Sequence, residues 1–199
     1  MQEKPFSQAC ENNKKPILQI LEKILLKPQT VLEIGSGSGQ HSVYFAEHLP
    51  HLQWHTSEQP ELHQGILAWH KTVNLTNLKP PFELTVSEKT QWPNRLFDSV
   101  FTANTTHIMS WSEVKILFKG VEKLLRTRGL FLQYGPIKIA GRFTSASNEK
   151  FEQWLKSQGE HMGIRDLADL EKLAKDSSMS LLKKFPMPAN NFILVWEKN

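Results

Sequence analysis

The sequence predicts an α/β protein: one mostly parallel β-sheet of seven strands with helices on both faces and an antiparallel last strand. Short, β-branched apolar segments alternate with longer amphipathic segments along most of the chain, which is typical of a parallel sheet covered by helices. The last two strand-like segments are joined only by "PMPANN". A connection of that length cannot cross over to a parallel neighbour, so it predicts an antiparallel hairpin.

The expected elements follow one another closely. An amphipathic helix over about 14–26 has its apolar residues on one face, and Pro28 closes it. Strands are expected at 30–34, 53–58, 82–86, 97–103, 130–134, 181–185 and 192–196. Further helices are expected from Gln40 to Pro50, which ends the helix, from Pro60, which opens one, to Val73, and over 114–125.

The length and composition indicate a globular protein. A chain of 199 residues can bury a sizeable core, and we expect a single domain over 1–199. Residues 1–28 are expected to form a helical extension, and 137–150 a mobile loop near the site. No apolar run approaches the roughly 18 residues of a membrane span, no secretory signal is visible, and Cys10 is the only cysteine. We therefore expect a cytoplasmic protein with no membrane partner.

The charge is mildly basic, with a formal net charge of +4. The basic residues are spread along the chain, which is typical of a soluble surface, so a nucleic-acid partner is compatible with the charge but not favoured. Three histidines, His48, His51 and His55, are close in sequence but straddle Pro50. No cysteine or suitable carboxylate completes a set of four ligands, so we expect no metal site.

The segment "VLEIGSGSGQHSVYF" places Gly35, Gly37 and Gly39 between a predicted strand and a predicted helix. Glycine lets a ligand approach the backbone closely, and the helix start adds free N–H groups. A P-loop would need Gly-Lys-Ser/Thr, and a dinucleotide fingerprint would need glycine in place of Gln40. Glu33, just before the turn, would repel a pyrophosphate. A nucleoside with a positive centre and no phosphate remains, and S-adenosylmethionine is such a ligand.

A second acidic residue, Glu58, ends the next predicted strand, about twenty residues after the glycines. In dinucleotide-binding folds an acidic side chain in this place accepts hydrogen bonds from the ribose hydroxyls. A tight turn and a surface glutamate would explain each feature separately. Together, in this order and spacing, they favour a cofactor site.

The sequence "EIGSGSG" over 33–39 resembles the first motif of class I S-adenosylmethionine-dependent methyltransferases, which have a Rossmann-like, seven-stranded sheet. The chain is further similar to the DUF938 (methyltransferase-like 26) family in "ACENNKKPILQIL", "VLEIGSGSGQHSVYFAEHLPHLQW", "TANTTHIMSW", "YGPIKIAGRFTSASNEKFEQWL", "GIRDLADL" and "MPANNFILVW". These stretches span nearly the whole chain. The resemblance implies a methyltransferase that uses S-adenosylmethionine.

The resemblance also implies which residues bind the cofactor. The methionine end is expected to lie against Glu33, Gly35, Ser36, Gly37 and Gly39, and the ribose against Glu58. Thr85 stands where relatives tend to carry an aspartate that contacts adenine, so the adenine contacts depart from the family pattern. Asn12 and Asn13 precede the first predicted helix and either fold over the cofactor as a lid or cap that helix.

Catalytic and substrate residues are expected in loops at the carboxyl ends of the strands. His107 is a candidate general base or only orients the next helix, and Asn104 is a candidate for cofactor and catalytic contacts. The stretch "NTTH" lacks the D/N-P-P-Y/F tetrad of enzymes that methylate amide or adenine nitrogens. The candidate substrate residues are Tyr134, Arg142, Asn148, Asn190 and Asn191.

A small metabolite is the favoured substrate, because no recognition domain is appended to the predicted fold. The alternatives are an RNA methyltransferase and a protein that binds the cofactor or a nucleic acid without catalysis. Trp111, just after "NTTH", could wall the substrate pocket, but we expect it in the core.

Overall fold

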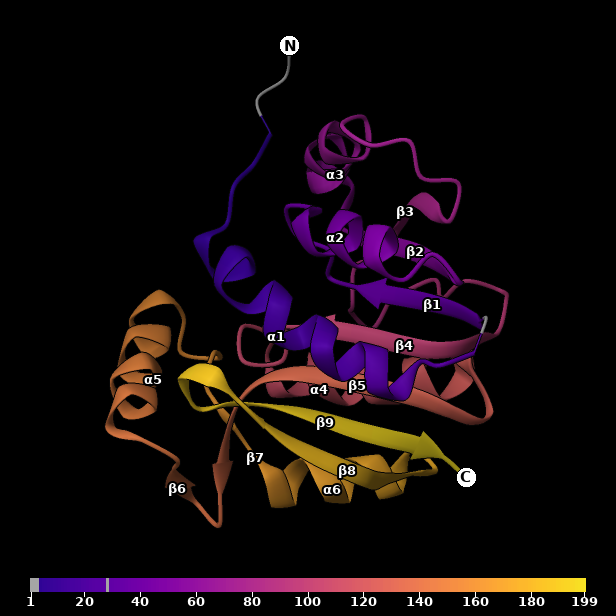
Figure 1. Cartoon of the computed structure of the whole chain (residues 1–199). Coiled ribbons are helices and arrows are strands. Elements are labelled where there is room, and N and C mark those ends of the chain that lie inside the picture. The colour runs from indigo at the N-terminus through magenta and orange to yellow at the C-terminus, as the bar shows by residue number, and fades with distance from the viewer. Residues whose placement is uncertain (1–3, 28) are drawn as a thin grey trace. The chain divides into compact units, whose positions relative to one another are not determined.

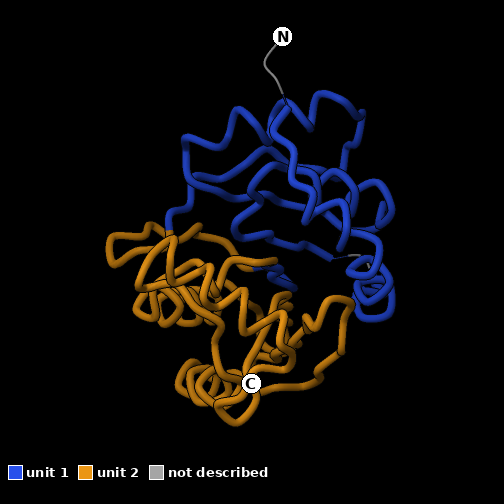
Figure 2. The backbone as a smooth tube through the Cα atoms, turned by 90° about the vertical axis from the view of Figure 1, so that its left-hand side faces the viewer, with its two compact units in different colours: residues 1–85, 97–102 blue, residues 86–96, 103–199 orange. Residues whose placement is uncertain are grey.

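The computed structural model describes residues 4–27 and 29–199 of the chain (Figure 1). The chain divides into two compact units, which Figure 2 colours separately. Unit 1 comprises the residues up to 85 together with 97–102, and unit 2 comprises 86–96 and 103–199. The single domain therefore stays a prediction, and the expected role of Pro28 falls outside the described residues.

Unit 1 is built on parallel strands in the order β3-β2-β1-β4 (Figure 1). The strands are β1 (Gln29–Ile34), β2 (Leu52–Glu58), β3 (Leu78–Glu83) and β4 (Phe97–Ala103). The helices are α1 (Gln8–Ile24), α2 (Gln40–His48), the short η1 (Pro60–Leu62) and α3 (His63–His70). Every pairing among these strands is parallel, so each connection contains a crossover, and α2 and α3 supply two of them.

The core of unit 1 contains a cluster of three aromatic side chains. Phe45 of α2, Trp54 of β2 and Phe101 of β4 form an aromatic cluster with ring centroids 5.4–5.8 Å apart. All three side chains are fully buried. Because such interiors are close-packed, the cluster holds α2 firmly against β2 and β4.

The first helix is longer than the sequence predicts. It begins at Gln8 with Ser7 as its N-cap, not at about residue 14. The prediction rests on the apolar face that begins at Ile17, and the first turns of the helix are polar, so the apolar pattern does not reveal them. Asn12 and Asn13 therefore lie within α1, and neither caps it.

The third strand lies earlier than the expected 82–86, because β3 ends at Glu83. Pro80 and Pro81 lie inside β3, and two adjacent prolines in a sequence argue against a strand. β3 is the edge strand of unit 1, and an edge tolerates proline because its outer side needs no N–H donor.

Unit 2 carries the antiparallel part of the fold (Figure 1). Its helices are α4 (Trp111–Leu124), α5 (Ala146–Gln158), α6 (Leu167–Asp176) and the short η2 (Pro188–Asn190). Its strands are β5 (Leu125–Ile139), β6 (Arg142–Phe143), β7 (Arg165–Asp166), β8 (Met179–Met187) and β9 (Asn191–Lys198). β9 is antiparallel to both β5 and β8, which confirms the predicted hairpin and the antiparallel last strand.

The segment 137–150 is not the irregular loop that its composition suggests. β5 continues to Ile139, a tight turn follows, and α5 begins at Ala146 with Ser145 as its N-cap. In the turn, Ala140 and Gly141 have φ values of 51° and 74°, which return the chain onto β5 as β6. The Gly, Ser and Thr residues that suggested a loop instead form this turn and the helix cap.

Candidate functional site

The glycine turn, residues 35–39, connects β1 to α2 in unit 1. Gly35, Gly37 and Gly39 have φ values of 75°, 56° and 86°, a left-handed conformation that favours glycine. The backbone N–H groups of Gly35 and Ser36 both donate to the carbonyl of Ser57, at 3.1 and 3.0 Å. These two bonds hold the turn against the end of β2. The left-handed φ values explain why three of its five residues are glycines.

The carboxyl group of Glu33 lies buried beneath this turn. Its Oε2 accepts hydrogen bonds from Ser36 Oγ and Trp54 Nε1, each at 3.1 Å. Both donors are neutral, and only 1% of the residue is exposed. Burial raises the pKa of Glu33 to about 7, and the nearby charge of Glu58 acts in the same direction. A buried carboxylate among neutral donors is a binding partner for a cation.

Glu58, at the end of β2, closes the other side of the turn. Its Oε2 accepts a hydrogen bond from the backbone N–H of Gly37 at 2.8 Å, and its Oε1 accepts one from Gln59 N at 2.9 Å. The structure therefore brings Glu33, the glycine turn and Glu58 together, as their spacing in the sequence led us to expect.

Two other predicted cofactor residues differ in their surroundings. Thr85 is exposed and lies two residues beyond the end of β3, whose last residue Glu83 pairs with Glu58. Asn13 is buried inside α1, where its Oδ1 lies 2.6 Å from His41 Nε2. Asn13 is therefore part of the packing of α1 on α2 and does not cap that helix, whereas its contact with a cofactor stays a prediction.

The candidate catalytic residues lie in unit 2, in the loop that joins β4 to α4. Asn104 has a φ of 59°, and its N–H donates to Tyr134 O at 2.9 Å, so the loop is tied to β5. A Cβ atom on Gly135 would lie 3.7 Å from His107 Nδ1 and 3.9 Å from Asn104 Oδ1. The structure thus brings His107 and Asn104 together beside the bare backbone of Gly135.

The imidazole of His107 is buried and neutral at pH 7. Its pKa is lowered to about 4, mainly by burial and also by the charge of Arg165, while the charge of Glu152 partly opposes the shift. In the described part of the chain, His107 Nδ1 has no hydrogen-bond partner. The unpaired nitrogen is a feature that a substrate group could satisfy.

Arg165, in the stretch "GIRDLADL", is not among the site residues expected from the sequence. Its guanidinium donates to Thr106 O at 3.0 Å and to Met109 O, and it lies 5.8 Å from the ring centroid of Trp111. Arg165 thereby holds the loop that carries His107. Trp111 is half-buried at the start of α4, so it is not a core residue. The only signal for Arg165 in the sequence is that it lies in "GIRDLADL", one of the stretches that resemble the family.

Three of the candidate substrate residues meet at the hairpin turn. Asn148 is buried, and its Nδ2 donates to Asn190 O at 3.0 Å. Asn191 Nδ2 donates to the carbonyls of Pro188 and Ala189, so it closes the turn. Of the other two, Tyr134 is buried within β5, and Arg142 is exposed on β6.

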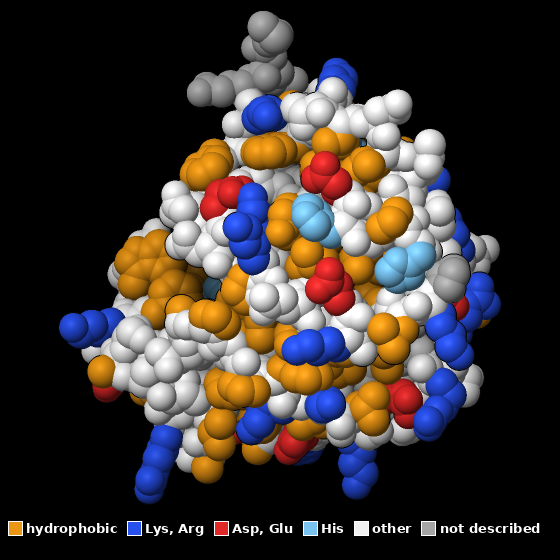
Figure 3. All heavy atoms as spheres, in the orientation of Figure 1, with side chains coloured by type: hydrophobic (Ala, Val, Ile, Leu, Met, Phe, Trp, Pro, Cys, Tyr) orange, Lys and Arg blue, Asp and Glu red, His pale blue; other side chains and the backbone are white. Residues whose placement is uncertain are grey.

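Three observations concern possible partners: a polyanion, a membrane and a metal ion. On the face shown in Figure 3, Lys and Arg side chains lie at many places, interspersed with hydrophobic, uncharged and acidic ones. Within residues 4–27 and 29–199, no helix is long and apolar enough to cross a membrane, and no three His, Cys, Asp or Glu side chains are placed to hold a metal ion.

Several solved structures are similar to this chain. An O-methyltransferase family protein from Burkholderia thailandensis is 13% identical, with a TM-score of 0.83, over 96% of this chain and 57% of its own. An O-methyltransferase family 2 protein from Planctomyces limnophilus, in complex with apigenin, is 13% identical, with a TM-score of 0.81, over 96% and 60%. Human N-acetylserotonin methyltransferase, in complex with S-adenosylmethionine, is 12% identical, with a TM-score of 0.78, over 96% and 53%.

These similarities establish the fold. They confirm a mostly parallel, open sheet of at least seven strands with helices, as the sequence predicts. The chain spans between 53% and 60% of the length of the three proteins. At the level of sequence, the model of the DUF938 family, described as a protein of unknown function, matches residues 4–198. Because the match extends over almost the entire sequence, this chain belongs to the DUF938 family.

Proposed function

We propose that this protein is an S-adenosylmethionine-dependent methyltransferase that acts on a small molecule. The observation that carries the proposal is the buried carboxylate of Glu33, held by two neutral donors under a left-handed glycine turn. A positively charged nucleoside complements this arrangement. Its charge stabilises the carboxylate of Glu33, and the glycines let the ligand approach the backbone closely. The similarity in fold to methyltransferases supports the same reading.

The residues of unit 1 fit this cofactor. Glu33 would bind the positively charged methionine end, together with the backbone of residues 35–39. Glu58 would accept hydrogen bonds from the ribose hydroxyls, since a carboxylate oxygen can accept a second bond beside that from Gly37. Thr85 offers an uncharged hydroxyl toward the adenine. When bound, the cofactor supplies a methyl group already activated by its sulfonium.

The residues of unit 2 would bind and deprotonate the substrate. The unpaired Nδ1 of His107 accepts a hydrogen bond from a substrate hydroxyl, and the amide of Asn104 orients that group. Because the pKa of His107 is about 4, the ring takes the proton as the methyl group bonds to the oxygen, when the O–H is strongly acidic. Asn190 remains the candidate substrate contact of the hairpin turn, because Asn191 uses its amide twice to close that turn, whereas Asn190 Nδ2 makes one exposed bond, of 3.4 Å, to Ser147 Oγ. Solved O-methyltransferases of this fold, one in complex with apigenin, support a hydroxyl on a small molecule. Within the DUF938 family we propose the methyltransferase-like 26 group.

The test uses the methyl donor carrying a labelled methyl group, with fractions of a cell extract. We expect the label to enter a small-molecule fraction, and the His107→Gln variant to transfer methyl at least about 100-fold more slowly while binding the donor as the wild type does. Glutamine keeps hydrogen-bonding groups but cannot take a proton. Transfer to RNA would overturn the substrate class, and binding of the donor without transfer to any fraction would favour a non-catalytic binding protein.

A further inference from the structure

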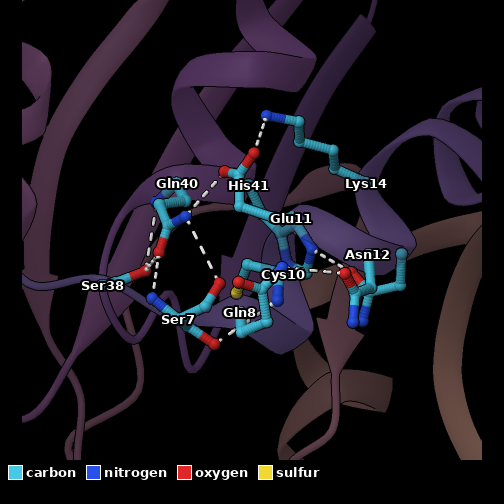
Figure 4. Close-up of polar contacts among 10 residues, drawn as sticks. Ser7, Gln8, Cys10, Glu11, Asn12, Lys14, Ser38, Gln40 and His41 are labelled. Atoms are coloured by element: carbon cyan, nitrogen blue, oxygen red, sulfur yellow. Dashed lines mark hydrogen bonds and ion pairs between the residues drawn. The ribbon is translucent and has the colours of Figure 1, made fainter.

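The side chain of Gln40 lies at the junction between the glycine turn and α2, yet it is directed toward α1 (Figure 4). Its Oε1 accepts hydrogen bonds from Ser7 N at 2.5 Å and Ser38 Oγ at 2.9 Å. Its Nε2 donates to Glu11 Oε1 at 2.7 Å and to Ser7 O at 3.4 Å. Every hydrogen-bonding position of this amide is therefore used, and only 3% of Gln40 is exposed.

Two further contacts hold the N-terminal part of α1 and the residues before it. His41, the next residue of α2, lies 2.6 Å from Asn13 Oδ1 of α1, and burial lowers its pKa to about 4. Before α1, Pro5 O accepts a hydrogen bond from Trp69 Nε1 of α3 at 2.7 Å. The start of α1 is thus fastened to both helices that follow the strands β1 and β2.

The position of Gln40 gives these contacts a consequence for ligand binding. Gln40 follows Gly39 directly and is the first residue of α2, and its own N–H donates to Ser38 Oγ at 3.4 Å. The start of a helix is where backbone N–H groups can bind a ligand. Ser38 lies in the turn itself, and its hydroxyl is held by the same amide. A displacement of α1 would therefore release the turn at Ser38 and the first turn of α2 together.

We propose that Gln40 is a positioning residue that couples α1 to the glycine turn, so that tight binding of S-adenosylmethionine requires α1 to be docked. The inference rests on the proposed function, because it concerns the cofactor of that same site. Coupling is reciprocal, so bound cofactor must in turn stabilise the docked state of α1.

Two variants at the Gln40–Glu11 contact test the coupling: one adds a second carboxylate, and the other exchanges the amide and the carboxylate. Gln40→Glu places a second carboxylate against Glu11, and like charges at hydrogen-bond distance repel strongly. In the double variant with Glu11→Gln, the amide and the carboxylate change places, and the new carboxylate still accepts from Ser7 N and Ser38 Oγ. Only the long bond to Ser7 O and the ion pair between Glu11 and Lys14 are lost. Gln53→Glu, at an exposed position of β2, adds the same charge elsewhere in unit 1 and serves as the control.

Affinity for S-adenosylmethionine is measured by calorimetry at a temperature at which circular dichroism shows every variant folded. We expect Gln40→Glu to bind about tenfold or more weakly, and the double variant and the control to stay within about threefold of the wild type. Hydrogen exchange is measured as well: the cofactor should slow exchange over 8–14 in the wild type and the double variant, but not in Gln40→Glu.

The outcomes separate the two proposals. A wild type that does not bind S-adenosylmethionine contradicts the proposed function. A wild type that binds, with Gln40→Glu binding equally well, overturns the coupling, even if that variant melts at a lower temperature. A double variant as weak as Gln40→Glu also overturns it, since the effect would then not pass through the contact with Glu11.

Discussion

Replacing Glu33 by glutamine is expected to stabilise the free protein while weakening its binding of S-adenosylmethionine. Glutamine has nearly the same shape, and its Oε1 can still accept hydrogen bonds from Ser36 and Trp54. It removes only the negative charge that burial makes unfavourable. The variant therefore separates what this side chain does for folding from what it does for a cationic ligand.

The size of the stabilisation follows from the pKa of Glu33, which burial raises from 4.5 to about 7. At about 1.4 kcal/mol for each tenfold change in proton affinity, ionisation of this group costs the free folded protein about 3 kcal/mol. Because the folded pKa is raised, the stability from the protonated group is fully present below about pH 4.5 and has been lost once the pH has risen through about 7. The variant does not titrate, so its advantage should grow over this range.

The assay is the free energy of unfolding of both proteins in urea at pH 5 and at pH 8. We expect a small difference at pH 5 and, at pH 8, an advantage of the variant that approaches about 3 kcal/mol. Calorimetry at pH 8 should show affinity for S-adenosylmethionine at least about tenfold weaker in the variant. The reasoning is refuted if the variant is the less stable protein at pH 8, or if the two proteins bind the cofactor equally.

Two further predictions concern the glycine turn and α4. Gly37→Ala should lower the free energy of unfolding by only about 1–2 kcal/mol, because its φ of 56° is strained for alanine but nothing lies within 4 Å of the new Cβ. Gly39→Ala should cost more, since its Cβ would lie 3.0 Å from Ile66 Cα, and a urea series in which Gly37→Ala is the less stable would contradict this. Ser110→Ala removes one half of a capping box with Glu113 and should cost about 1 kcal/mol; an unchanged urea midpoint would show that the cap contributes nothing.

The fold could be predicted wherever buried strands and strong helices follow one another. β1, β2, β4 and α4 lie within two or three residues of their expected positions, because their apolar patterns are determined by burial. β3, in contrast, is an edge strand with two prolines, and its pattern carries no such signal. The length of β5 and the helices α5 and α6 were also missed, because Gly135-Pro136 resembles the end of a strand and the polar surface of the helices masks their period.

The sequence indicated several residues of the candidate site, but it did not indicate their burial, their partners or their pKa values. The spacing of Glu33 and Glu58 sufficed to bring them together, because parallel strands end at one edge. The pKa of His107 could not be foreseen, since it depends on burial and on Arg165, which lies far along the chain. Asn13 was misplaced for a similar reason: its partner His41 lies on another helix, and sequence periodicity says nothing about such pairs.

The most direct test of the proposed function is a calorimetric titration of the wild-type protein with S-adenosylmethionine at pH 8, repeated with NAD and with ATP. The buried carboxylate of Glu33 and the glycine turn predict that S-adenosylmethionine binds at one site per chain and that the two phosphate-containing ligands do not bind there. Heat from NAD or ATP, with none from S-adenosylmethionine, would contradict the assignment of the site.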